Sequence, residues 1–422
     1  MKDSTPLPRR RFLVLTGHAA IAAALSGCGK KAAKPATKAA DKHPQAPEKA
    51  TEKATESVVA KPPAPRPKRT YPVVLGTLLG PGRHDDKTTG KRAHYIAIVD
   101  LDAPADSPAR IRRIPTTFFG HGIATHPTEH HRAVVFEKKG PGACAIDLRT
   151  GAVTAVITTT KDRAFYGHGV FSTDGKKLYC TESITGDRSE RGLIAVRDGK
   201  TYKLLGTFPS HGRAPHDLHL VDEGRTLVVT NGGGRIAADE TELDHPNVAW
   251  VDVKTQQLQR RLPFDARRVN AGHVALGPRD TVAVVSAPRT GIDKKSDRFR
   301  GGVSFLPAKA PVLQTTSHRI SERFKGEVLS VAIHQKTGVA ATTCPDGGVV
   351  AFWDAASGAL LSTIDLAHAR GVSITLDGAY FAVTHGKDAL VTLVSTATLQ
   401  VATRANRSWM SGSHTIVRRD IG

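Results

Sequence analysis

Gly167-His168-Gly169-Val170 opens a segment whose beginning recurs seven times along the chain. The seven openings are Gly120-His121-Gly122-Ile123, Gly167-His168-Gly169-Val170, Pro215-His216-Asp217-Leu218, Gly272-His273-Val274-Ala275, Val328-Leu329-Ser330-Val331, Ala369-Arg370-Gly371-Val372 and Ser413-His414-Thr415-Ile416. Successive openings are 47, 48, 57, 56, 41 and 44 residues apart. Repeats of about 40–50 residues are typical of β-propeller blades. Because one blade cannot bury its own faces, we predict an all-β, seven-bladed ring.

Each repeat divides into four short strands separated by turn residues. In the second repeat we expect strands at residues 168–172, 177–182, 192–196 and 202–208, with Asp-Gly turns after the first and third. No long stretch has a helical period, which excludes parallel sheets with crossover helices. In the fifth repeat, residues 348–358 resemble the Trp-Asp strand of WD-repeat propellers.

The seventh blade is divided between the two ends of the repeat region. One strand, 414–418, lies at the C-terminal end, and three expected strands, 71–79, 94–101 and 109–114, lie before the first repeat. Pairing the last strand with these three closes the ring and removes exposed sheet edges. We therefore expect the propeller to span residues 71–422.

The N-terminal residues have the pattern of an export signal. Arg9-Arg10-Arg11-Phe12-Leu13 matches a twin-arginine signal, and an apolar stretch too short to span a bilayer follows it. Leu25-Ser26-Gly27-Cys28 then matches a lipoprotein signal-peptidase box. We predict that residues 1–28 are the signal and that Cys28 carries the lipid. Gly29 follows the cysteine, so no inner-membrane retention is signalled, and we expect a periplasmic protein anchored to the outer membrane.

Residues 29–70 are predicted to form a disordered tether. They consist mainly of Ala, Lys, Pro, Thr and Glu, which cannot bury a core. A flexible chain of this length reaches roughly 30–40 Å. The tether carries +7 of the formal net charge of +21, beside a lipidated cysteine, where it favours anionic head groups. Because export removes the chain from the cytoplasm, we expect no nucleic-acid partner, and we expect a monomer.

Three cysteines remain after Cys28. Cys144, Cys180 and Cys344 lie in apolar runs, and we interpret them as small core residues. A disulfide between Cys144 and Cys180, in neighbouring blades, remains open from the sequence.

Several of these segments resemble one known family. Tyr166 to Ser172, Phe208 to Leu218 and Val229 to Gly233 are similar to the bacterial domain-of-unknown-function family 1513 (DUF1513), and the resemblance extends over about residues 73–422. Members look like exported propellers, often encoded beside imelysin-type iron-uptake lipoproteins and di-haem peroxidases. The resemblance implies the fold and the compartment, and it indicates metal biology and a periplasmic partner of one of these types, but no agreed activity.

The recurring histidines are the main candidate site. The first strand of each blade lines a propeller's channel, so the five imidazoles should ring one mouth. They are His121, His168, His216, His273 and His414. The loops between the second and third strands emerge on the same face, and we expect Glu182, Arg191 and Asn231 to add ligand-binding groups there. Leu329 and Arg370 replace the histidine in blades five and six, whose loops of this kind are short; blade one is an exception, with a histidine and a short loop at residues 138–141.

Neutral imidazoles are good ligands for iron, copper or zinc. The first four histidines are therefore candidate metal ligands. The alternative is that all five are structural, each hydrogen-bonding between blades, because seven-bladed channels are wide. Asp217 is a candidate to orient His216, whereas His126, His130 and His131 are expected in a solvated turn on the other face.

Three classes of function remain open. The first is a non-catalytic, lipid-anchored binding protein that serves iron or other metal uptake. The second is a protein-interaction scaffold without metal. The third is a lactonase-like or quinoprotein-like enzyme, although we find no nucleophile elbow and no acidic metal cage, and we name no catalytic residue.

Overall fold

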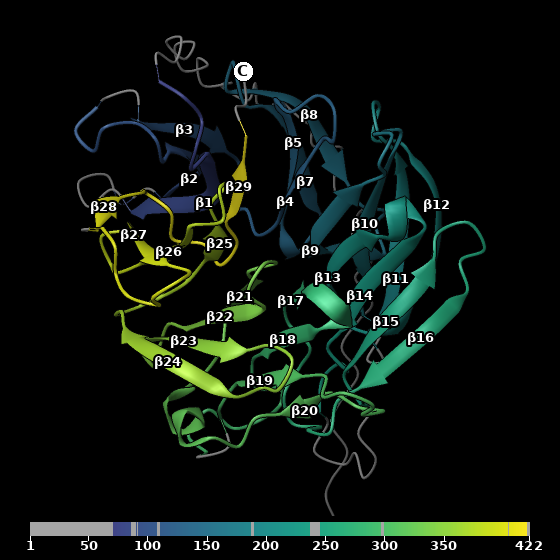
Figure 1. Cartoon of the computed structure of the whole chain (residues 1–422). Coiled ribbons are helices and arrows are strands. Elements are labelled where there is room, and N and C mark those ends of the chain that lie inside the picture. Colours follow the sequence, from purple (N-terminus) through teal and green to yellow (C-terminus); the bar gives the residue numbers. More distant parts are fainter. Residues whose placement is uncertain are drawn as a thin grey trace, which may run out of the picture. The chain divides into compact units, whose positions relative to one another are not determined.

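Seven small antiparallel sheets stand in a ring and confirm the predicted seven-bladed β-propeller (Figure 1). The computed structural model describes residues 71–85, 90, 92–107, 110–186, 190–236, 245–296, 299–403 and 405–419. The signal, Cys28 and the tether lie outside the described residues. No helix among the described residues is both long and apolar enough to cross a membrane.

The blades follow one another along the chain, each running from the channel outwards. Blade one contains β4 (Ile123–Thr125), β5 (Arg132–Phe136), β7 (Gly142–Asp147) and β8 (Ala152–Thr158). Blade two contains β9 (Arg163–Phe171), β10 (Lys177–Ile184), β11 (Arg191–Asp198) and β12 (Leu204–Arg213), and β6 (Lys138–Gly140) joins its inner edge. Blade three contains β13 (Pro215–Val221), β14 (Thr226–Asn231), β15 (Asn247–Asp252) and β16 (Leu258–Pro263).

The remaining blades keep this order. Blade four contains β17 (Val274–Leu276), β18 (Val282–Ser286), β19 (Gly302–Phe305) and β20 (Gln314–Thr315). Blade five contains β21 (Ser330–Ile333), β22 (Val339–Cys344), β23 (Val349–Asp354) and β24 (Leu360–Asp365). Blade six contains β25 (Val372–Ile374), β26 (Tyr380–His385), β27 (Leu390–Ser395) and β28 (Asn406–Arg407). Short 3₁₀ turns occupy η2 (Asp222–Gly224), η3 (Pro278–Asp280) and η4 (Arg319–Arg323).

The seventh blade closes the ring as the sequence predicts. Its inner strand β29 (Ile416–Arg418) pairs antiparallel with β1 (Thr77–Asp85), which continues to β2 (Arg92–Asp100) and β3 (Ile111–Thr116). β1 extends beyond the predicted end at residue 79, although Gly80-Pro81-Gly82 reads as a turn. The extension is an ordinary ladder with β2, and an Asp85–Arg92 ion pair of 2.6 Å joins its far end.

The apolar core lies between the blades. Seven clusters of buried side chains fill the seven junctions, and each cluster combines residues of two neighbouring blades. One cluster joins Leu79 and Ile96 of blade seven to Val135 and Ile146 of blade one. Because each face of a sheet packs against the neighbouring blade, a single blade cannot bury its apolar side chains by itself.

The Trp-Asp strand supplies the largest buried side chain of one junction, Trp353. Trp353 in β23 is fully buried between blades four and five, and its Nε1–H donates to Thr342 Oγ1 at 2.9 Å. Asp354 accepts hydrogen bonds from the backbone N–H and the hydroxyl of Ser357, which fixes the following turn. The sequence resemblance to a WD-repeat strand therefore has a local structural basis.

The three cysteines of the propeller have free thiols. Cys144, Cys180 and Cys344 are buried and unbonded to one another, as small core residues are. Burial raises the pKa of Cys144 to about 12 and that of Cys344 to about 11. The thiols are therefore protonated at neutral pH, and the possible Cys144–Cys180 bridge is absent from this structure.

We expect Trp353→Ala to destabilise the propeller by about 3–5 kcal/mol, because it removes the largest buried side chain of the junction between blades four and five. Chemical denaturation followed by near-ultraviolet circular dichroism measures the change. Val156→Ala is the control, since Val156 is 75% exposed and should shift the midpoint little. Equal midpoints for the two variants would contradict the packing described here.

Candidate metal centre

Five histidines stand where the inner strands begin. His168 and His216 lie in β9 and β13, and His121, His273 and His414 lie just before β4, β17 and β29. The predicted recurring position is thus one recurring place around the channel. Register shifts in the ladders of β9 with β10 and of β13 with β14 fall at His168 and His216. Such bulges re-aim a side chain out of the regular ladder.

Two glycines allow the histidines to approach one another. Gly167 has a φ of +113°, and a Cβ there would lie 2.5 Å from Cδ2 of His121. A Cβ on Gly122 would lie 2.8 Å from Nδ1 of His168. Any side chain at either position would displace an imidazole. The Gly-His-Gly sequence is therefore a packing requirement of the first two blades.

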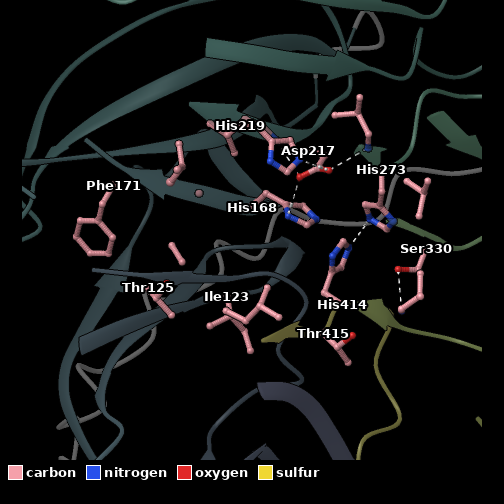
Figure 2. Close-up of a pocket in the computed structure, with 18 of the residues that line it drawn as sticks. Ile123, Thr125, His168, Phe171, Asp217, His219, His273, Ser330, His414 and Thr415 are labelled. Atoms are coloured by element: carbon pink, nitrogen blue, oxygen red, sulfur yellow. Dashed lines mark hydrogen bonds and ion pairs between the residues drawn. The ribbon is translucent and has the colours of Figure 1, made fainter. Parts of the chain in front are cut away.

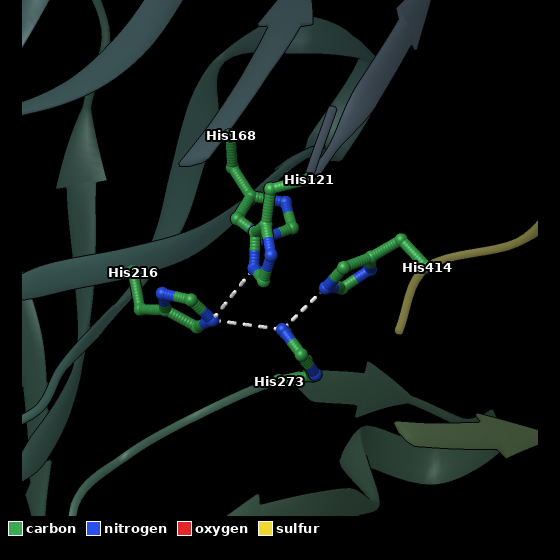
Figure 3. A group of neighbouring side chains, drawn as sticks. All are labelled: His121, His168, His216, His273 and His414. Carbon is green, nitrogen blue, oxygen red and sulfur yellow. Dashed lines mark hydrogen bonds between the residues drawn. The ribbon is translucent and has the colours of Figure 1, made fainter. Parts of the chain in front are cut away.

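The five imidazoles converge on one point (Figure 3). One nitrogen from each ring lies within 4.8 Å of the corresponding nitrogen of every other ring. Nε2 of His216 is 2.8 Å from Nε2 of His273 and 3.4 Å from Nε2 of His121, and Nε2 of His414 lies against Nε2 of His273. Ligands with bonds of about 2.0–2.1 Å to one metal lie roughly 3.0–3.4 Å apart. The expected width of the channel does not keep the side chains apart, and His414 joins the four predicted metal ligands.

An outer hydrogen bond sets the tautomer of one ring, and a carboxylate lies beside a second ring. Nδ1 of His273 faces the carbonyl oxygen of Leu329 at 2.5 Å, so Nδ1 carries the proton and Nε2 keeps a lone pair. Nδ1 of His168 faces Oδ1 of Asp217 at 3.4 Å, while Nε2 of His168 is buried without a hydrogen-bond partner among the described residues. His273 therefore directs a bare nitrogen towards the other imidazoles, as metal-bound histidines do, and the carboxylate of Asp217 favours the same tautomer in His168.

Asp217 lies beside His168 and orients it. The sequence had led us to expect that Asp217 orients the adjacent His216 instead. The carboxylate of Asp217 also accepts hydrogen bonds from the backbone N–H groups of Leu218 at 2.9 Å and Val274 at 3.1 Å. Burial acts to raise the pKa of Asp217, but His219 and His168 outweigh it and hold the pKa well below its usual value. A permanent negative charge therefore lies beside the histidines (Figure 2).

All five imidazoles are neutral at physiological pH. Burial is the main cause, and it lowers the pKa of His168 to about 4 and of His273 to about 3. The pKa values of His121, His216 and His414 are well below 6.5 for the same reason. For His121 and His216 the positive charge of Lys138 is the next cause. Neutral rings keep the lone pairs that a metal requires.

The histidines form a layer between two cavities. On one side, His121 lines a cavity of about 630 Å³ at the channel mouth, and we call it the mouth cavity. On the other side, His168, His273 and His414 line a cavity of about 220 Å³ within the channel (Figure 2). One histidine therefore lines the mouth cavity, and three others line the cavity within the channel.

The three other predicted ligand residues are placed elsewhere. Glu182 lies inside blade two, 1% exposed, with Oε1 3.0 Å from Nη2 of Arg197. Asn231 is fully buried and bonds to Ser210 and Asn247 within blade three. Arg191 is exposed at the start of β11 and does not line either cavity. Glu182 and Asn231 were expected to contribute from the loops between the second and third strands, but they lie in β10 and β14. Because alternate side chains of a strand point to opposite faces of the sheet, a small error in a strand end is enough to place a side chain inside the blade.

The turn histidines also differ from expectation. His126 is 5% exposed rather than solvated, and its Nδ1 accepts the backbone N–H of Glu129 at 3.0 Å. His130 is exposed, as predicted. His219 and three charged residues of the mouth cavity, Lys138, Glu327 and Arg370, were not predicted from the sequence, and of these only Arg370 stands at a repeat position.

The family model of DUF1513, described as a protein of unknown function, matches residues 114–416. The chain belongs to the DUF1513 family. No curated protein matches it in sequence. Among solved structures, hydrazine synthase of Kuenenia stuttgartiensis is similar, with a TM-score of 0.55 and 13% identity over 72% of this chain and 92% of that one. At this identity the similarity concerns the fold alone.

The pKa shifts predict a steep acid sensitivity of the metal-free protein. Each buried histidine is neutral when folded and titrates near 6.5 when unfolded, so its contribution is complete above pH 6.5 and declines as the pH falls towards the folded pKa. For His168 the window extends to a pH of about 4. Between pH 6 and 4.5, each such histidine should lower the free energy of unfolding by about 1.4 kcal/mol per pH unit.

Chemical denaturation of metal-free protein at pH 4.5–7.5 measures this slope. His168→Gln should reduce the slope by about 1.4 kcal/mol per pH unit, the contribution of one buried histidine. His130→Gln, at an exposed histidine, should leave it unchanged. A His168→Gln slope equal to that of the unmodified protein would show that His168 is not held neutral.

Proposed function

We propose that this protein is a non-catalytic, lipid-anchored periplasmic propeller that holds a transition-metal ion at its five histidines and serves a metal-uptake system. The convergence of five imidazole nitrogens within 4.8 Å carries the proposal. In a purely structural cluster, the single lone pair on Nε2 of His273 would have to accept hydrogen bonds from both His216 and His414. One cation satisfies all the bare nitrogens at once, which supports the metal over the structural alternative.

The donor set narrows the class of metal. Imidazole nitrogen suits iron, copper and zinc, whereas magnesium and calcium prefer oxygen ligands. Among divalent ions the Irving–Williams order places copper above zinc and iron in affinity. We therefore expect binding of all three, with copper tightest in equilibrium measurements, and the metal carried in the cell to depend on supply.

The compartment and the partners are inferred from the sequence. A twin-arginine signal and a lipidated Cys28 would place the propeller on the periplasmic side of the envelope. There it would meet an imelysin-type or di-haem peroxidase partner, which are the neighbours that the family resemblance implies. The large rigid rim of a propeller suits such an accessory role.

Metal analysis of the purified, untagged protein tests the site. We expect about one bound ion per chain, and a ligand present at 100 times its Kd should stabilise the fold by about 2.7 kcal/mol. His216→Ala and His273→Ala should abolish both the bound metal and the stabilisation, because each removes a nitrogen from the centre of the cluster. Inductively coupled plasma mass spectrometry and thermal melting with added Fe²⁺, Cu²⁺ or Zn²⁺ provide the readouts.

Two variants complete this experiment. Asp217→Asn keeps all five ligands but weakens the support of His168, and we expect a 10–100-fold loss of metal affinity. His130→Ala removes an exposed histidine and should change nothing. No bound metal in the unmodified protein, together with no shift in melting temperature with any of the three ions, would refute the metal proposal.

Cell fractionation tests the anchor separately. Cys28→Ser should move the protein from the membrane to the soluble periplasmic fraction, since it removes the lipidated thiol. Replacing both Arg9 and Arg10 by lysine should leave the chain in the cytoplasm. A membrane-bound Cys28→Ser variant would contradict lipid anchoring.

A further inference from the structure

The mouth cavity has charged walls next to the histidine layer. His121 and Ser413 line the cavity on the side of the histidines. Oγ of Ser413 lies within hydrogen-bonding distance of Nδ1 of His121, at 3.4 Å. Lys138 comes from the hairpin of blade one, and Glu327 and Arg370 come from the connections that lead into blades five and six. The two blades without a histidine thus contribute charges to the mouth instead.

Two cations of this cavity, Lys138 and Arg370, attract Glu327 without forming a close ion pair with it. Among the described residues, Lys138, Glu327 and Arg370 make no ion pair within 4.0 Å, and the Nε of Arg370 is buried without a hydrogen bond. Desolvation raises the pKa of Glu327, whereas the nearby charges of Lys138 and Arg370 lower it. Lys138 is exposed and Glu327 and Arg370 are half-buried, so the two cations and one carboxylate leave a net positive charge that an anion from solvent can reach.

Other charged residues of the same cavity are already engaged. Arg92 is bound to Asp85 at 2.6 Å, and Oε2 of Glu137 accepts the backbone N–H of Gly142 at 3.1 Å. The guanidinium of Arg83 lies 5.5 Å from the centre of the Phe119 ring. The side chains of the cavity that remain available to a charged ligand are therefore two cations, Lys138 and Arg370, and one carboxylate, Glu327.

The charge balance of a metal centre points in the same direction. Five neutral imidazoles leave a divalent ion with its full charge, and Asp217 is the only carboxylate in contact with the histidine cluster among the described residues. Lys138 is close enough to the cluster to lower the pKa of all five histidines. A second cation so near a metal ion is unfavourable unless an anion lies between them.

We propose that the mouth cavity binds a small hydroxycarboxylate, whose carboxylate lies between Lys138 and Arg370 and whose hydroxyl donates to Glu327. This inference rests on the proposed metal centre, whose charge the carboxylate offsets. A guanidinium and an ammonium are suitable partners for a carboxylate. A phosphate dianion also carries an O–H group, but its second negative charge would lie close to Glu327, so the cavity favours the singly charged hydroxycarboxylate.

Isothermal titration of the mature full-length protein with glycolate, acetate and phosphate tests the site, at constant ionic strength. We expect the Zn²⁺-loaded protein to bind glycolate at least 10-fold more tightly than the metal-free protein and more tightly than acetate or phosphate. Lys138→Met and Arg370→Leu should each weaken glycolate at least 10-fold. Glu327→Gln should remove the preference for glycolate over acetate.

The controls separate this proposal from the metal proposal. Lys139→Met removes the same charge from a neighbouring residue outside the cavity lining and should leave glycolate binding unchanged. Arg370→Leu introduces the residue that blade five carries at the same position, so its melting temperature reports whether the fold is retained. Zinc content measured on the same samples shows whether the metal centre is present.

Each outcome is decisive. Zinc-loaded protein that binds glycolate equally in the unmodified, Lys138→Met and Arg370→Leu forms would overturn the cavity proposal while leaving the metal centre intact. Tighter binding of phosphate than of glycolate would overturn the assignment of the ligand class. Protein that takes up no zinc, but whose glycolate affinity still depends on Lys138 and Arg370, would refute the metal centre and retain the anion site.

Discussion

The pairing of β29 with β1 is the constraint on which the rest of the structure depends. Three residues near the C-terminal end, Ile416–Arg418, form a ladder with Thr77–Leu79 and complete the seventh blade. Without it two sheet edges and two apolar faces would be open, and the last of the seven junctions would not form. Closure also brings His414, two residues before β29, to the other four histidines.

The histidine layer illustrates how a repeat fold produces a site that no single repeat contains. Five of the seven blades each contribute one imidazole, and at two of these positions a threonine of the preceding blade holds the backbone. The hydroxyl of Thr181 in blade two donates to the carbonyl oxygen of His216 in blade three at 3.1 Å, and that of Thr230 in blade three donates to Gly272 in blade four at 2.7 Å. These buried bonds preorganise the ligands, so little conformational entropy remains to be lost on binding.

Electrostatics make the two sides of this layer different. Asp217 and His219 lie on the channel side, where the carboxylate orients His168, whereas Lys138, Glu327 and Arg370 surround the mouth. Burial removes protons from the imidazoles and makes them ligands, whereas the charged groups of the mouth are exposed or half-buried. The proposed metal would bind the neutral imidazoles, and the proposed anion would offset the positive charge at the mouth.

Repeat spacing and strand periodicity, which are local properties, were enough to predict the number of blades, the closure by terminal strands and the shared position of the five histidines. The sequence alone did not decide which way individual side chains turn. Glu182 and Asn231 lie at predicted strand ends but face into the sheets, Asp217 supports His168 instead of its neighbour, and Lys138, Glu327 and Arg370 meet only across the channel. Those relations depend on bulges, on the pleat and on contacts between blades distant in sequence, which only the tertiary structure sets.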